Sequence, residues 1–325
     1  MFFTKNQKDG LKNISVTADT ISLAQEKLRD YSASEELFFA HTSYITLGED
    51  TAKESIIPYL IYIGRSTAFR EDTPIFIIVG GTAKELILGA GGESYDATNA
   101  LKSLERNLEN RGDCQIFSAS NVMAALNQRD ACLITAVRCT KANEVLEDAT
   151  EDELTALPAG YAVISGGRML GTLDMDAARG VSILQNKLKS SFVGLEVEGE
   201  PVALLLENCS CEISPKMSGE KATSLDIKIE INSAMAEADG EPLLDKINRA
   251  LEAEAAEWVK AAMDAELKYG CDFLGLGSIL ERQKPFKLAG LSGSFADCLG
   301  GLSYNINVKA EVVRSFDLED TEGSE

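Results

Sequence analysis

The sequence predicts an α+β protein of several domains, with mixed and antiparallel sheets and, toward its C-terminus, a long amphipathic helix packed on an antiparallel sheet. The chain has 325 residues, of which 45% are hydrophobic, enough for two or three domains with cores of their own. Strand-like runs with alternating or wholly apolar residues are interspersed with runs of helical period. One helical stripe, Pro242–Tyr269, has predicted strands on both sides in sequence.

We place the domain boundaries at residues 88 and 158, which gives an N-terminal α/β subdomain (1–88), a middle helical/β subdomain (89–158) and a C-terminal domain (159–325). The second boundary lies at a Pro-Ala-Gly turn. In the first subdomain the patterns predict helices at Thr20–Tyr31, Ala52–Ile63 and Thr82–Ile87, and strands at Phe38–Asp50 and Pro74–Val79. In the second they predict helices at Asp96–Asn110 and Ser120–Asn127, with Ser120 as a cap, an exposed acidic stretch at Glu144–Ala156, and a strand at Ala131–Arg138.

The C-terminal domain has the clearest pattern. Gly166-Gly167 between two short strands predicts a hairpin, and Asp174 can cap a helix over Ala177–Lys189. The strands predicted after it are Phe192–Val197, Val202–Ile213, Leu225–Ile231 and the closing strand Ser303–Phe316. The long helix between the last two has an apolar stripe around Trp258. Such a stripe can be a coiled-coil seam or a binding face, but the flanking strands favour packing on the protein's own sheet.

Charge limits the partners of the chain. Lys and Arg number 31 against 52 Asp and Glu, a formal net charge of −21. Phosphate groups are bound by Lys and Arg, so this balance argues against nucleic acid and against an anionic membrane surface. The longest apolar runs, Ser55–Gly64 and Pro74–Gly81, fall short of the roughly 20 residues that span a bilayer. The residues as given predict a soluble chain without a signal peptide.

Candidate chemical groups are few. Gly80-Gly81, between a strand and a helix, could hold a phosphate on backbone N–H groups, but neither common nucleotide-binding spacing is present. The glycines of Gly89–Ser94 could likewise form an anion-holding loop, although a surface loop is favoured. His41 could act as a general base, but a structural role is favoured because no nucleophile motif accompanies it. Cys209 and Cys211 are interpreted as buried thiols. We therefore expect no enzyme activity, no cofactor and no metal.

Two segments resemble the Ger(x)C family of spore germination proteins, the C subunits of germinant receptors. Ala162–Gly180 resembles the start of that family's C-terminal domain, with Ala177-Ala178 where the family commonly has Glu-Thr. Cys271–Gly277 resembles the motif that follows its long helix. The family-motif residues, interpreted as structural, are Gly171, Arg179, Gly180, Asp272, Gly275 and Gly277. Weaker similarity extends through Phe39–Thr46, Arg65–Phe76 and Ala83–Leu86.

The resemblance implies a non-catalytic subunit of a spore germinant receptor, acting in nutrient-triggered germination with membrane-embedded partner subunits. It implies a location at the outer face of the inner spore membrane, held by a lipid anchor on a cysteine that these residues do not show. Two alternatives stay open. One is a small-ligand or nucleotide-binding protein that uses Gly80-Gly81 and the following helix. The other is a general envelope scaffold that shares only the fold.

Overall fold

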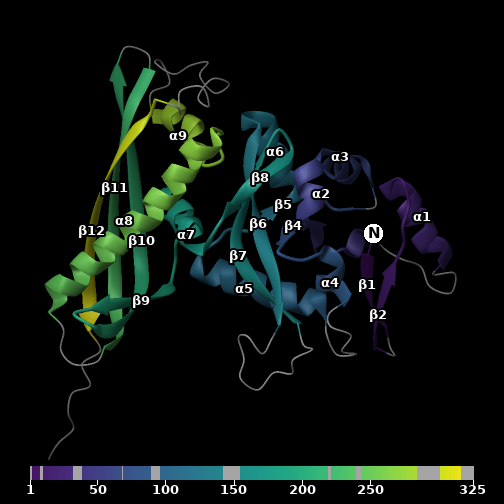
Figure 1. Cartoon of the computed structure of the whole chain (residues 1–325), viewed down its shortest axis with the longest axis horizontal. Helices are drawn as coiled ribbons and strands as arrows, with labels where there is room; N and C mark the ends of the chain where they lie inside the picture. The colour runs from purple at the N-terminus through teal and green to yellow at the C-terminus, as the bar shows by residue number, and fades with distance from the viewer. Residues whose placement is uncertain are drawn as a thin grey trace, which may run out of the picture.

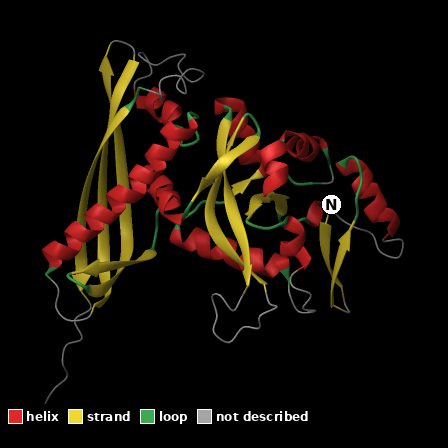
Figure 2. Ribbon diagram, in the orientation of Figure 1, coloured by secondary structure: helices red, strands yellow, loops and turns green. Residues whose placement is uncertain are grey.

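A computed structural model of the chain describes residues 2–7, 10–31, 39–67, 69–88, 96–141, 154–218, 221–238, 243–283 and 301–315. Three bodies follow one another along the long axis: a small hairpin with helix α1, a central sheet with helices around it, and a second sheet covered by the long helix α8 (Figure 1). Figure 2 shows helices between the two sheets. The predicted α+β class with mixed sheets is confirmed.

The central sheet has six strands, in the order β3-β4-β6-β7-β8 with β5 beside β4. Strands β3, β4 and β6 are parallel, and β5, β7 and β8 pair antiparallel with their neighbours. Their bounds are β3 Ile45–Gly48, β4 Pro74–Val79, β5 Phe117–Ser118, β6 Ala131–Lys141, β7 Leu154–Ser165 and β8 Arg168–Leu173. Strand β4 is apolar throughout because it is covered on both faces: Phe76 and Ile78 belong to one core cluster, and Ile75 and Ile77 to another.

Five helices surround this sheet: α2 Glu49–Glu54, α3 Ile57–Arg65, α4 Ala83–Leu88, α5 Ala97–Arg111 and α6 Ala119–Arg129. Pro58 stands in the first turn of α3, where its missing N–H costs nothing. Asp96 caps α5 by accepting from the N–H groups of Thr98 and Asn99. The predicted cap of α6, Ser120, is wrong. Ser118 is the cap, because the helix already begins at Ala119 and the Ser118 hydroxyl accepts from the Asn121 N–H.

The N-terminal part differs most from the expectation. Strands β1 (Phe2–Gln7) and β2 (Gly10–Ser15) form an unpredicted hairpin, followed by α1 (Ile21–Tyr31). The predicted strand Phe38–Asp50 is a 3₁₀ turn, η1 (Phe39–His41), and then the short β3. The chain turns at η1 because Phe39 points inward and packs on Phe69, with ring centroids 5.6 Å apart.

The second sheet has the order β12-β11-β10-β9. Its strands are β9 Ser191–Val197, β10 Glu200–Ser218, β11 Lys221–Ala238 and β12 Ser303–Ser315. The first three pair antiparallel as expected, but β12 runs parallel to β11. The reason is that α8 lies between β11 and β12 in sequence and returns the chain along the sheet, so β12 starts at the same end as β11.

Helix α8 (Leu244–Tyr269) covers this sheet, and its apolar stripe is core. The stripe's fully buried members are Ile247, Leu251, Ala255, Val259, Ala262 and Met263, with Trp258 only 2% exposed. Polar side chains of α8 also cap the edge strand: Glu252 accepts from the Ala310 N–H and Asn248 from the Val312 N–H. The helix therefore protects an edge that could otherwise pair with another chain.

Candidate functional site

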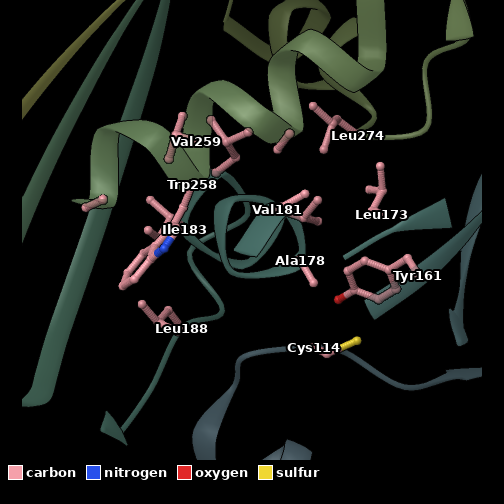
Figure 3. Close-up of a cluster of buried hydrophobic side chains, with 14 of the residues drawn as sticks. Cys114, Tyr161, Leu173, Ala178, Val181, Ile183, Leu188, Trp258, Val259 and Leu274 are labelled. Carbon is pink, nitrogen blue, oxygen red and sulfur yellow. The ribbon is translucent and has the colours of Figure 1, made fainter. Parts of the chain in front are cut away.

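Helix α7 (Met175–Leu184) joins the two sheets. It starts at Asp174, whose carboxylate accepts from the Ala177 N–H at 2.9 Å, as the sequence predicted. It ends at Leu184, short of the predicted Lys189, because Asn186 adopts a left-handed conformation with φ 56°. Figure 3 shows α7 between Trp258 and Val259 of α8 on one side and Tyr161 and Cys114 on the other. One continuous core cluster takes in all four of these side chains.

Gly180 allows α7 and α8 to touch through their backbones. A Cβ atom at this position would lie 2.0 Å from the Trp258 carbonyl oxygen and 3.0 Å from the Val259 nitrogen. Both atoms belong to the main chain of α8 and cannot rotate away. The glycine of the family motif therefore sets the distance between the two helices.

The neighbouring motif residue, Arg179, contacts both halves of the chain. Its guanidinium lies over the Trp258 ring, 5.3 Å from the centroid. Its Nε lies 3.6 Å from Oδ1 of Asp113, in the loop between α5 and β5. The Asp113 side chain is 3% exposed and also accepts from the Ser191 hydroxyl at 2.6 Å. Arg179 thus places a positive charge next to the buried carboxylate of Asp113. We call this contact region between α7 and α8 the junction.

Replacing Arg179 with methionine should lower the free energy of unfolding by about 2 kcal/mol, because Asp113 stays buried without its cation and the Trp258 ring loses a cation–π contact. Urea denaturation measures the effect. The control is Arg70→Met. Arg70 pairs with Asp72, but both side chains are more than 60% exposed, so little change is expected. Equal losses in the two variants would contradict the role of Arg179.

The remaining motif residues lie where α8 ends. Asp272 caps α9 (Leu276–Gln283): its carboxylate accepts from the N–H groups of Leu276 at 2.7 Å and Gly277 at 3.0 Å. Gly275 has φ +75° and lies against the Arg129 guanidinium. On β8, a Cβ at Gly171 would lie 2.2 Å from the Tyr269 hydroxyl oxygen. All six motif residues thus lie at or next to the contact between α8 and the rest of the chain.

Glu266, in the last turn of α8, is fully buried beside this cap. Its Oε2 accepts from the Leu274 N–H at 3.1 Å. Burial raises the pKa of the Glu266 carboxyl well above its ordinary value, and the nearby charge of Asp272 raises it further, while Arg129 lowers it less. The carboxyl is therefore held with its proton. We interpret it as a neutral packing group, which suits a position between a helix end and a cap.

Sequence reasoning missed Asp113, Arg129 and Glu266. Asp113 and Arg129 meet their partners across 66 or more positions of the chain, a distance at which no local pattern signals a contact. Glu266 did carry a signal, because it follows Trp258 and Ala262 at steps of four along the buried stripe. An acidic residue on that stripe predicts a buried carboxyl.

The other candidate groups from the sequence do not come together in one site. At Gly80-Gly81, the Gly80 and Thr82 N–H groups donate to the carboxylates of Glu49 and Glu85, so a phosphate would meet two negative charges. His41 is exposed at the end of η1. Among the described residues, no group of His, Cys, Asp and Glu could hold a metal ion. The loop Gly89–Ser94 and residues 142–153 of the acidic stretch lie outside the described residues.

Cys209 and Cys211 lie on β10 and are buried and half-buried, respectively, with Ser210 exposed between them. Burial raises the pKa of each thiol to about 12. Both thiols are therefore protonated at neutral pH, as expected for small apolar side chains.

The fold is α+β, and the motif residues lie at or next to the contact between its two halves. Residues 159–316 match the family model described as "Spore germination B3/GerAC like, C-terminal", and residues 3–138 match "Spore germination protein N-terminal domain". A solved structure described as "Crystal Structure of the GerBC protein" shares the fold with a TM-score of 0.67 and 13% identity, covering 96% of this chain and 97% of that chain. No curated protein sequence matches.

The chain belongs to the Ger(x)C family of spore germination proteins. The two family models follow each other in the expected order and together take in most of the chain. None of the described helices is long and apolar enough to cross a membrane.

Proposed function

We propose that the chain is the non-catalytic C subunit of a spore germinant receptor and acts in nutrient-triggered germination with membrane-embedded partner subunits. The observation that carries this proposal is the match of both family domains, in order, on one chain. We place the subunit at the outer face of the inner spore membrane, held by a lipid anchor. The acidic charge of the chain agrees with attachment through an anchor and partner subunits better than with direct adsorption to anionic lipid.

The geometry of the junction supports a scaffold role. The six motif residues take part in a close approach of a glycine to α8 or to Arg129, in a cation–π contact or in a helix cap. We propose that these residues keep the two sheets in a fixed arrangement, so that the subunit presents one rigid surface to its partners. The covered face of the C-terminal sheet and the capped edge of β12 are occupied by α8, and partners are therefore expected on other surfaces.

Affinity purification of the tagged full-length protein from spore membranes tests the assembly. We expect the membrane-embedded receptor subunits to co-purify with the tagged chain, and recovery of the chain without them would favour a general envelope scaffold. Two variants are compared in the same purification. Gly180→Ala disturbs the junction, whereas in Gly194→Ala, the control, the added carbon has no atom within 4 Å. Capture should fall for the first variant only.

Gene deletion tests the role in germination. In a strain that lacks redundant receptors, loss of this gene should abolish the response to nutrient, while a trigger that bypasses nutrient receptors still germinates the spores. Normal nutrient germination of that strain would contradict the proposal.

A further inference from the structure

A groove of about 350 Å³ lies between helix α6 and the turn that follows α8, and its volume is at the low end for small-molecule sites. One wall is a face of α6, where the small side chains Ala124 and Ala125 leave room. Phe273 and Gln185 line the groove from the C-terminal half of the chain. Figure 1 shows α6 and α9 near the top of the view, at the same end of the molecule. The groove is therefore built from both halves.

Arg129, in the last turn of α6, lines this groove and has no polar partner among the described residues. Its guanidinium makes neither a hydrogen bond nor an ion pair with any of them. The Nε atom is buried, whereas the two Nη atoms keep exposed surface. Arginine carries five N–H donors, and a guanidinium partly removed from water is normally bonded through them. An open guanidinium on a groove wall therefore indicates that an anion completes it.

Gly275 makes room for this guanidinium. A Cβ atom at position 275 would lie 2.5 Å from an Nη atom of Arg129 and 3.3 Å from its Cζ. The φ angle of Gly275, +75°, also favours glycine. Gly275 lies in the turn between α8 and α9, so the C-terminal half of the chain sets where the charge of Arg129 is placed.

The acidic groups near Arg129 are engaged elsewhere. Glu266 is held neutral by its proton, and the Asp272 carboxylate accepts from two backbone N–H groups of α9. Asp130, the next residue, is exposed and is not part of the groove wall. None of the described lining residues is Asp, Glu, Lys or His. Arg129 is therefore the one charge on the described walls, and it is positive.

The other lining groups limit the kind of anion. Asn121 and Gln128 of α6 carry amides on the wall, and neither amide nitrogen donates to a described residue, because the Asn121 bonds run through its Oδ1. Phe117 and Phe273 add aromatic surface. A single guanidinium with amide donors beside it matches one planar carboxylate. A phosphate or a polyanion would call for further cations, which the described walls lack.

We propose that this groove binds a small organic carboxylate, with the carboxylate on the Arg129 guanidinium and an apolar body against Phe117 and Phe273. The amides of Asn121 and Gln128 donate the further hydrogen bonds. The inference is built from the groove and its open arginine, and it does not rest on the proposed receptor role.

Benzoate and benzamide test the charge preference on the full chain, because they share size and shape and differ in charge. Each has about nine non-hydrogen atoms, so a Kd on the order of a millimolar is expected for benzoate. Benzamide should bind at least about fivefold more weakly, because it carries no charge for the guanidinium. Ligand-observed NMR titrations at low ionic strength, where screening is small, give both affinities. No binding of benzoate, or equal binding of the two probes, overturns the proposal.

Arg129→Met removes the charge and keeps an apolar side chain of similar reach. Benzoate binding should weaken about fivefold or more, to the level of benzamide, while benzamide binding stays the same. Arg106→Met is the matched control, because Arg106 is exposed on α5 and does not line the groove. Equal benzoate affinity in the Arg129→Met and Arg106→Met proteins overturns the role of Arg129.

Ala124→Phe blocks the groove without touching Arg129. Ala124 is exposed on α6, so the larger side chain leaves the core of the protein intact and fills the space between the walls. Binding of both probes should be lost. Ala253→Phe makes the same change at an exposed position of α8 outside the groove, and binding should be unaffected. Benzoate binding that survives Ala124→Phe overturns the assignment to this groove, whatever the stability of Arg129→Met.

Discussion

Alanine at position 180 is expected to lower the free energy of unfolding by about 3 kcal/mol or more. The added carbon would lie 2.0 Å from the Trp258 carbonyl oxygen, so α7 and α8 must separate before the side chain fits. Overpacking a well-filled interior costs about 1–3 kcal/mol, and occasionally more. The upper end applies here because the obstructing atoms are main chain. Urea denaturation with linear extrapolation measures the loss.

Trp258 is the single tryptophan of the chain and lies in this contact, so its fluorescence reports on the junction directly. The control is Gly194→Ala on strand β9, where the added carbon meets nothing within 4 Å. Alanine also restricts the unfolded chain, so this control should stay within about 0.5 kcal/mol of the wild type or gain slightly. A Gly180→Ala protein with wild-type stability and unaltered Trp258 emission would show that the helices do not depend on this close approach.

Sequence patterns correctly predicted the elements that are determined by residues close together in sequence. Helix α5, the hairpin at Gly166-Gly167 and the wholly apolar β4 are all in place. Each combines a periodic run of residues with a turn or cap residue at its end, and both signals are read within a few positions. The division into domains at residues 88 and 158 stays a prediction.

The features that the sequence did not predict have a common cause, because each depends on contacts between distant parts of the chain. Strand β1, with the sequence FFTKNQ, has no sustained alternation, and among the described strands it pairs with β2 alone, which is equally polar. The direction of β12 depends on where the crossover through α8 delivers the chain, which no residue of β12 encodes. The contacts of Arg179 with Asp113 and Trp258 are likewise tertiary. Family resemblance marked Arg179 and Gly180 as notable, but only the packing of α7 shows what they contact.

Both motif segments lie against helix α8 or its C-terminal end. Arg179-Gly180 packs α7 against the middle of α8, and just after the end of α8 Asp272 caps α9, with Gly275 beside Arg129 of α6. Because α8 is held near its middle and at its C-terminal end, it cannot slide or tilt against α7 without breaking both contacts. A close-packed protein interior has low compressibility and transmits strain.

The pH dependence of stability tests the second of these points through Glu266. Burial raises the folded pKa of its carboxyl above the ordinary 4.5, so above pH 4.5 the folded chain keeps a proton that the unfolded chain has released. The contribution of this group to stability is complete below pH 4.5 and is lost as the pH rises toward the folded pKa. The loss is about 1.4 kcal/mol for each pH unit within that window.

Glu266→Gln should therefore match the wild type near pH 4 and become progressively more stable than it as the pH increases, by about 1–3 kcal/mol at pH 7. Glutamine keeps an oxygen to accept from the Leu274 N–H and carries no proton to lose. Urea denaturation at intervals of half a pH unit gives the difference curve. Glu257→Gln removes a carboxylate of the same helix whose side chain is 69% exposed, so the rising difference should be absent from it. A Glu266→Gln difference that is flat from pH 4 to pH 8 would mean that the carboxyl reaches solvent, and that the end of α8 is held less tightly than its burial indicates.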